Sequence, residues 1–172
     1  MRIRFTLSAC ALVCVFATHA ALAHLIPQQM GSVRLVDGKA YVVMGIPSTV
    51  LFSAPYLTGN AVELDTYEAQ QQKASDTVRV GITMQCADNP MALLDLRLQP
   101  EIHYENASPA VPQVTAMLIF SMPEPRCRMR FSTSLFHTDD RELSYQLRVT
   151  LEDAISSEHI LTQQQPFFEL DS

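Results

Sequence analysis

From Thr77 onward, apolar and polar residues alternate at every second position through most of the chain. This period is typical of antiparallel strands that cover one face. Roughly seven or eight such strands, separated by turn residues, predict a mainly β fold: an antiparallel β-sandwich, immunoglobulin-like or related. A last short strand is expected at residues 159–163. The apolar positions of the other segments are Val78, Val80, Ile82, Met84 and Cys86; Leu94, Leu96, Leu98, Pro100, Ile102 and Tyr104; Val114, Ala116, Leu118 and Phe120; Cys127, Met129, Phe131, Thr133 and Leu135; and Leu143, Tyr145, Leu147, Val149 and Leu151.

Residues 32–46 predict a β-hairpin. Asp37-Gly38 separates two β-type runs, and this dipeptide supplies the positive φ angles of a tight two-residue turn. Both faces of the second run, residues 41–46, are apolar. We therefore expect this strand to be central in its sheet and covered on both sides.

Residues 48–76 differ from the rest and predict a loop–helix insert, with a short helix at about 62–75. Asp65 is the expected N-cap, and Glu68 follows it at capping-box spacing. Only Val62, Leu64 and Tyr67 are apolar in the helical stretch. We therefore expect the helix to lie on the surface.

Residues 1–23 have the three parts of a secretory signal peptide. Arg2 and Arg4 precede an apolar run at 7–17, and Ala21-Leu22-Ala23 offers small residues at a cleavage site. Cleavage there leaves residues 24–172 as a single β-sandwich-like domain, and cleavage after Ala20 is the alternative. No later segment has the length and apolarity of a membrane span. The expected location is the periplasm or the extracellular space.

Charge narrows the expected partners. The chain has 12 basic and 18 acidic residues and a formal net charge of −6. The signal peptide removes two arginines and no acids, so the mature chain is more acidic still. This balance argues against nucleic acid and anionic membrane surfaces as partners.

Cleavage also removes Cys10 and Cys14, which leaves Cys86 and Cys127. In an oxidising compartment a single remaining pair usually closes a disulfide. The alternative is two separate buried thiols.

A mature chain beginning at His24 would place an α-amine and an imidazole on one residue, and copper suits such nitrogen ligands. A copper site needs a second ligand, for which His103 and His137 are the candidates, with His159 further along the chain. Most methionines lie on apolar strand positions and are expected to fill the core.

Arg126, Arg128 and Arg130 place three guanidinium groups on one face of a predicted strand. This stripe is a candidate contact for an anionic ligand or an acidic partner. The alternative is that the arginines pair with carboxylates of a neighbouring strand.

Residues 57–68 align with a calcium-binding EF-hand loop when Glu68 takes the last position. The oxygen donors and the turn glycine that such a loop requires are replaced by Leu57, Gly59, Ala61 and Val62. The insert therefore matches an EF-hand-like loop only in degenerate form, and we expect no calcium site.

The run His24-Leu25-Ile26-Pro27-Gln28-Gln29-Met30-Gly31, the hairpin ending in Ile46-Pro47 and the loop–helix insert resemble an uncharacterised family of bacterial periplasmic proteins. The family carries an N-terminal HLIPxQxG segment, and some members keep an intact EF-hand-like insert. The resemblance covers residues 24 to about 80. It implies a periplasmic setting in a Gram-negative bacterium and no particular reaction.

The sequence contains no nucleophile elbow, zinc-protease helix or phosphate-binding glycine loop. We therefore expect a non-enzymatic accessory or protein-interaction module whose partner is a periplasmic protein and which has no cofactor. The alternative is a periplasmic copper-binding protein that uses His24. The sequence does not define the oligomeric state.

Overall fold

The computed structural model describes residues 27, 29–105, 108–123, 127–136, 143–151 and 155–170. Within these ranges the chain forms strands joined by short helices and one long helix. The helices are α1 (Ser48–Leu51), the 3-10 turn η1 (Ala54–Tyr56) and α2 (Leu64–Gly81). The strands are β1 (Met30–Val36), β2 (Lys39–Pro47), β3 (Leu57–Thr58), β4 (Ala61–Glu63), β5 (Ile82–Cys86), β6 (Asn89–Pro90), β7 (Leu93–Glu105), β8 (Ser108–Ser121), β9 (Met129–Thr133), β10 (Ser144–Leu151), β11 (Ile155–Thr162) and β12 (Phe167–Leu170).

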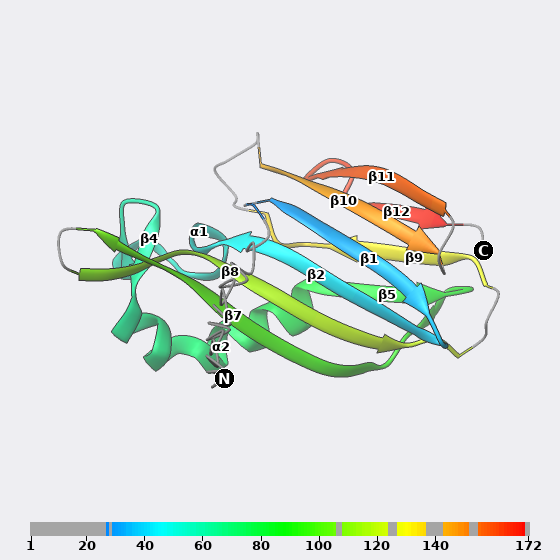
Figure 1. The fold of residues 1–172 in the computed structure, drawn as a ribbon, viewed down its shortest axis with the longest axis horizontal. Helices are drawn as coiled ribbons and strands as arrows, with labels where there is room; N and C mark the ends of the chain where they lie inside the picture. The colour runs from blue at the N-terminus through cyan, green and yellow to red at the C-terminus, as the bar shows by residue number, and fades with distance from the viewer. Residues whose placement is uncertain are drawn as a thin grey trace, which may run out of the picture.

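The larger sheet contains eight strands in the order β11-β10-β1-β2-β8-β4-β3, with β7 on the other side of β8 (Figure 1). Its neighbouring strands are antiparallel except β1 and β10, which run parallel. Strands β11 and β7 therefore lie at opposite edges of the sheet.

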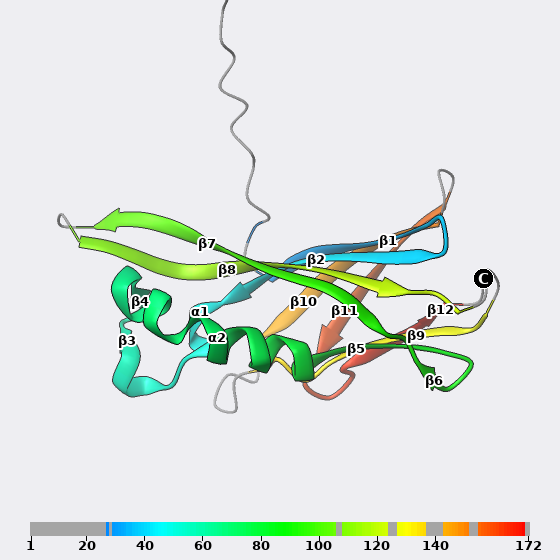
Figure 2. The same ribbon diagram turned by 90° about the horizontal axis from the view of Figure 1, so that it is seen from below.

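The second layer combines the smaller sheet, in the order β12-β9-β5-β6, with helix α2. Figure 2 shows both beneath the same face of the larger sheet, with α2 under β7 and β8 and continuing directly into β5. The predicted mainly β, sandwich-like fold is confirmed. Among the helices of the described ranges, none is both long enough and apolar enough to cross a membrane.

The core lies between these two layers. In β2 and β8 every second side chain points into it and is almost fully buried, as the alternation predicted. On these two strands the buried apolar side chains include Val42, Met44 and Ile46 and Val114, Ala116, Leu118 and Phe120.

The predicted hairpin is confirmed as β1 and β2. Asp37 and Gly38 have φ angles of 51° and 68°. Two successive positive φ angles match the twist of the flanking strands, which explains why this dipeptide fixes the register. Val36 consequently pairs with Lys39, and Val33 with Val42.

The predicted helix was too short, but its position on the surface is confirmed, because only one side of it is buried. Helix α2 continues to Gly81, so Val78 lies on a helix rather than on a strand. Tyr67, Ala74, Val78 and Gly81 are buried along one side of it, and their spacing follows helical rather than strand periodicity. Glu63, not Asp65, is the N-cap, and its side chain makes no capping hydrogen bond.

A Cβ atom at Gly81 would lie 2.3 Å from Cδ2 of Leu135. Any larger residue at this position would therefore require the Leu135 side chain to shift. This contact anchors the junction between α2 and β5.

The predicted single apolar face of β7 was also wrong. Register shifts occur between Leu93 and Asp95 and between Glu101 and His103. Each shift changes which side chains face the core, so Leu94 is 55% exposed and Tyr104 is 77% exposed. Alternation alone could not reveal these shifts, because a bulge leaves the polar pattern nearly unchanged.

Candidate functional site

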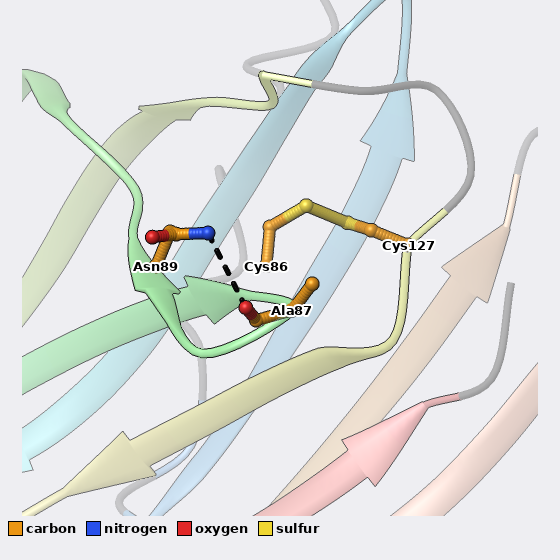
Figure 3. The surroundings of a disulfide bond; sticks show 4 residues. All are labelled: Cys86, Ala87, Asn89 and Cys127. Atoms are coloured by element: carbon orange, nitrogen blue, oxygen red, sulfur yellow. Dashed lines mark hydrogen bonds between the residues drawn. A yellow bond between two sulfur atoms is a disulfide. The ribbon is translucent and has the colours of Figure 1, made fainter.

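Cys86 ends β5, Cys127 lies just before β9, and their sulfur atoms form a disulfide. Their Cα atoms are 5.6 Å apart, within the ordinary range for a disulfide. Figure 3 shows the bond beside a tight turn, in which the Asn89 side-chain amide donates a hydrogen bond to the carbonyl oxygen of Ala87 at 3.3 Å. The predicted pairing is confirmed, and the alternative of two separate thiols is wrong.

Among the predicted copper ligands, only His103 and His159 lie within the described residues. His24 and His137 lie outside the described residues. His103, on β7, is exposed, and its Nε2 lies 3.0 Å from Oε1 of Glu101. Within the described part of the chain, no group of three or more histidine, cysteine, aspartate or glutamate side chains is placed to hold a metal ion.

Glu101 joins β7 to β8 through its second oxygen. Nε2 of Gln113, a side chain that is only 1% exposed on β8, donates a hydrogen bond to Oε2 of Glu101. His103, Glu101 and Gln113 thus form a polar network at one end of the sheet. Because it satisfies part of a buried amide, the network has a structural role.

The arginine stripe is only partly described, because Arg126 lies outside the described ranges. The Arg128 guanidinium donates to the Glu169 carboxylate on β12. Arg130 lies over the ring of Phe167, with Cζ 3.7 Å from the ring centroid. Arg128 therefore follows the predicted alternative of pairing with a carboxylate on a neighbouring strand, whereas Arg130 contacts an aromatic ring of that strand instead.

The outer face of the larger sheet, which points away from α2 and the smaller sheet, carries an apolar strip. The strip consists of Tyr41 and Val43 on β2, paired with Ile119 and Met117 on β8. Met117 is 36% exposed, and the other three are half-buried. The prediction that β2 is central is confirmed. The prediction that both faces of β2 are fully covered is wrong at Tyr41 and Val43, whose side chains are partly exposed.

Charged side chains border the strip. Arg34 on β1 pairs in register with Tyr41, and Asp95 on β7 pairs with Ile119. An apolar centre with a charged rim is the usual composition of a protein-contact surface. The sequence indicated the apolar residues but could not show that no described element covers them.

A second surface feature is an open groove of about 630 Å³ between α2 and β7. Its lining is mainly polar, with Gln71, Gln72 and Ser75 of the helix opposite Arg97 of the strand. Glu68 of the helix also lines the groove. The groove therefore offers charged and hydrogen-bonding groups to a ligand.

His159 on β11 points inward, and its ring stacks on Phe168 of β12 with centroids 4.2 Å apart. Phe168 in turn stacks on Phe131, with centroids 5.3 Å apart. Nε2 of His159 lies 2.9 Å from Oγ of Ser157. Burial lowers the pKa of His159 below its usual value. Sequence reasoning treated this residue as a candidate ligand, but it is part of the contact between the two sheets.

A scan against protein-family models finds no match to this chain. A search of curated proteins also finds none. Neither comparison assigns a catalytic family.

Proposed function

We propose that this chain is a secreted or periplasmic protein-interaction module without enzymatic activity. The observation that carries the proposal is the apolar strip formed by Tyr41, Val43, Met117 and Ile119 on the outer face of the larger sheet. On the outer face of an antiparallel sheet, these positions ordinarily hold polar residues. Apolar groups exposed side by side lose contact with water when another protein covers them.

The occupant that fits this surface is a folded partner protein with an apolar patch bordered by charges of both signs. Arg34 lies on one side of the strip and Asp95 on the other. A partner with polar and charged groups around its own apolar patch can contact Arg34 on one side and the Asp95–Arg97 ion pair on the other. Rim charges of this kind set orientation and association rate more than affinity.

The test is affinity capture, with cross-linking, from the periplasm of the organism that carries the gene. The strip variant is Val43→Lys with Met117→Lys, which places two charges on one cross-strand pair. The matched control is Thr83→Lys with Ser132→Lys, which places two charges on one exposed cross-strand pair of the smaller sheet, away from the strip. We expect the wild type and the control to retain one partner, and the strip variant to lose it. Equal recovery by a folded strip variant, or substrate turnover by the wild type, contradicts the proposal.

Copper binding by a mature N-terminal His24 stays a prediction from the sequence. Its test is a comparison of copper(II) affinity between the correctly processed protein and a form with one extra N-terminal alanine. The extra residue removes the α-amine from His24 and with it the paired nitrogen ligands. Equal, weak affinity in both forms would end this alternative.

A further inference from the structure

Strand β11 is an edge with little protection against pairing with another strand. Within the described part of the chain it pairs only with β10, in continuous register from Ile155 to Thr162. It contains no proline and no bulge. Ile160 on its outer face is 65% exposed.

The hydrogen bonds of the neighbouring residues show which backbone groups of β11 point outward. The amide of Gln146, the register partner of Ile160, donates to the carbonyl oxygen of Gln29 at 2.8 Å, away from β11. The amide of Thr162 donates to the carbonyl oxygen of Gln165 at 3.1 Å instead of to β10. In an antiparallel ladder these directions alternate. The N–H and C=O groups of Ser156, Glu158 and Ile160 therefore point away from β10.

The opposite edge, β7, carries several of the features that prevent edge pairing. Two register shifts bend it, Pro100 removes a backbone donor, and Asp95 and Arg97 form an ion pair at 3.1 Å. Native sheets protect their edges with bulges, prolines and charges of this kind. A chain that protects one edge in this way and leaves the other regular fits an arrangement in which the regular edge is covered in the assembled protein.

We propose that β11 pairs antiparallel with β11 of a second copy of this chain, about a two-fold axis that passes through His159. In this register Glu158 of each copy pairs with Ile160 of the other, and the two His159 rings face each other on the inner side. Each such hydrogen-bonded pair exchanges two N–H···O bonds. The larger sheets of the two copies become one continuous sheet.

A second copy suits this edge because antiparallel pairing about a two-fold axis is closed. The pairing occupies the β11 edge of both copies, so neither edge remains open to a third copy. Glu158 adds little net charge to the contact, because its carboxylate accepts hydrogen bonds from Arg148 at 3.1 Å and from Gln146 at 3.3 Å.

Charge and stacking favour the axis at His159 over an axis at Glu158. An axis at Glu158 would set two carboxylates directly opposite each other, which destabilises a strand pair. An axis at His159 instead places Glu158 beside the aliphatic side chain of Ile160. It also brings together two imidazole rings that Phe168 already supports by stacking at 4.2 Å.

This inference goes beyond the proposed function and does not depend on it. If both hold, the dimer presents two apolar strips on one wide sheet face and can bind a partner at two points. The contact involves one short strand from each copy, so we expect weak association that depends on protein concentration.

Cysteine cross-linking across the axis tests the proposal. Only a residue on a two-fold axis faces itself, and the Cα atoms of a non-hydrogen-bonded antiparallel pair lie about 4.5 Å apart, within disulfide range. We expect oxidised His159→Cys to form a covalent dimer, and Glu158→Cys to form at least about tenfold less, which corresponds to about 1.4 kcal/mol. The native disulfide leaves Cys86 and Cys127 unable to interfere.

Leu94→Cys is the matched control on the protected edge, at a residue that is 55% exposed. Random collisions would cross-link this control at least as readily as His159→Cys. That result, a monomeric His159→Cys protein, or a dominant cross-link at Glu158→Cys would overturn the proposal.

Amide exchange of the wild type gives a second test that needs no substitution. Pairing protects the outward amides of Glu158 and Ile160, so we expect their exchange to slow as protein concentration rises. Exchange at these two amides that is independent of concentration, up to the solubility limit, would also overturn the proposal.

Discussion

The two edge strands of the larger sheet, β7 and β11, differ in how well their unpaired backbone groups are protected from pairing with another strand. Strand β7 is long, bent by two register shifts and interrupted by Pro100, and it lies above helix α2. Strand β11 is shorter, regular and free of proline, with Ile160 exposed on its outer side. Both leave backbone groups at an edge, but only β7 carries the features that discourage another strand from pairing.

The irregularities of β7 are of the kind by which native sheets protect an edge. They also connect it to its neighbours, because Glu101, at the second register shift, accepts hydrogen bonds on both oxygens. The regularity of β11 depends instead on its inner side, where His159 packs against the smaller sheet. Substitutions in the packing beneath β11 and in the network of β7 should therefore change the free energy of unfolding by different amounts.

The largest effect is expected from Phe168→Ala. Phe168 is 6% exposed and stacks between Phe131 and His159, so its loss opens a cavity beneath β11. Such truncations typically lower the free energy of unfolding by about 3–5 kcal/mol. Chemical denaturation measures the change. Tyr104→Ala, at a 77% exposed residue of β7, should change it by no more than about 0.5 kcal/mol. Similar losses in the two variants would contradict this account of β11.

The next largest effect is expected from Glu101→Ala on β7. This change takes the carboxylate acceptor from the buried Gln113 amide. A hydrogen bond between a charged group and a buried amide is worth about 1–3 kcal/mol. Glu101→Gln keeps an acceptor and should recover most of the loss in denaturant unfolding. If Glu101→Gln is as unstable as Glu101→Ala, the network does not connect the two strands as described.

Pro100→Val should change unfolding by less than about 1 kcal/mol but remove one protection of the β7 edge. Valine restores a backbone donor and favours the extended conformation. In an Ile160→Glu background, the new carboxylate faces Glu158 of a second copy and blocks pairing through β11. In that background we expect Pro100→Val to increase association measured by light scattering. Unchanged scattering would show that the register shifts alone protect this edge.

The smallest effect is a pH dependence from His159. Its pKa is lowered by burial, so the unfolded chain binds a proton more readily than the fold does. The resulting stability is complete above the usual histidine pKa of about 6.5 and is lost as pH falls toward and through the lowered value. His159→Gln should therefore flatten the slope of unfolding free energy against pH in that window. Equal slopes in the two proteins would contradict the assigned shift.

Alternation and turn chemistry predicted the regular parts of this fold. Asp37-Gly38 fixed the hairpin because positive φ angles are a local property. The inward residues of β8 alternate without interruption from Val114 to Phe120, and all of them are buried. In both cases the signal lies within a few consecutive residues, which a sequence shows directly.

The remaining features depend on contacts between distant segments. The end of α2 at Gly81 is set by Leu135, which approaches it from beyond β9. Tyr41 and Val43 are partly exposed because the second layer packs against only the opposite face of the larger sheet. The edge position of β11 depends on sheet order, which its sequence alone does not encode.

Sedimentation velocity over a concentration series tests most directly the claim that β11 is the edge that pairs. Ile160→Glu places a carboxylate directly opposite Glu158 of the other copy, which destabilises the strand pair. Leu94→Glu is the matched change on the protected edge. We expect the wild type and Leu94→Glu to show the same shift toward a dimer as concentration rises, and Ile160→Glu to remain monomeric. A wild type that stays monomeric throughout, or a dimer lost in Leu94→Glu and kept in Ile160→Glu, would contradict the account.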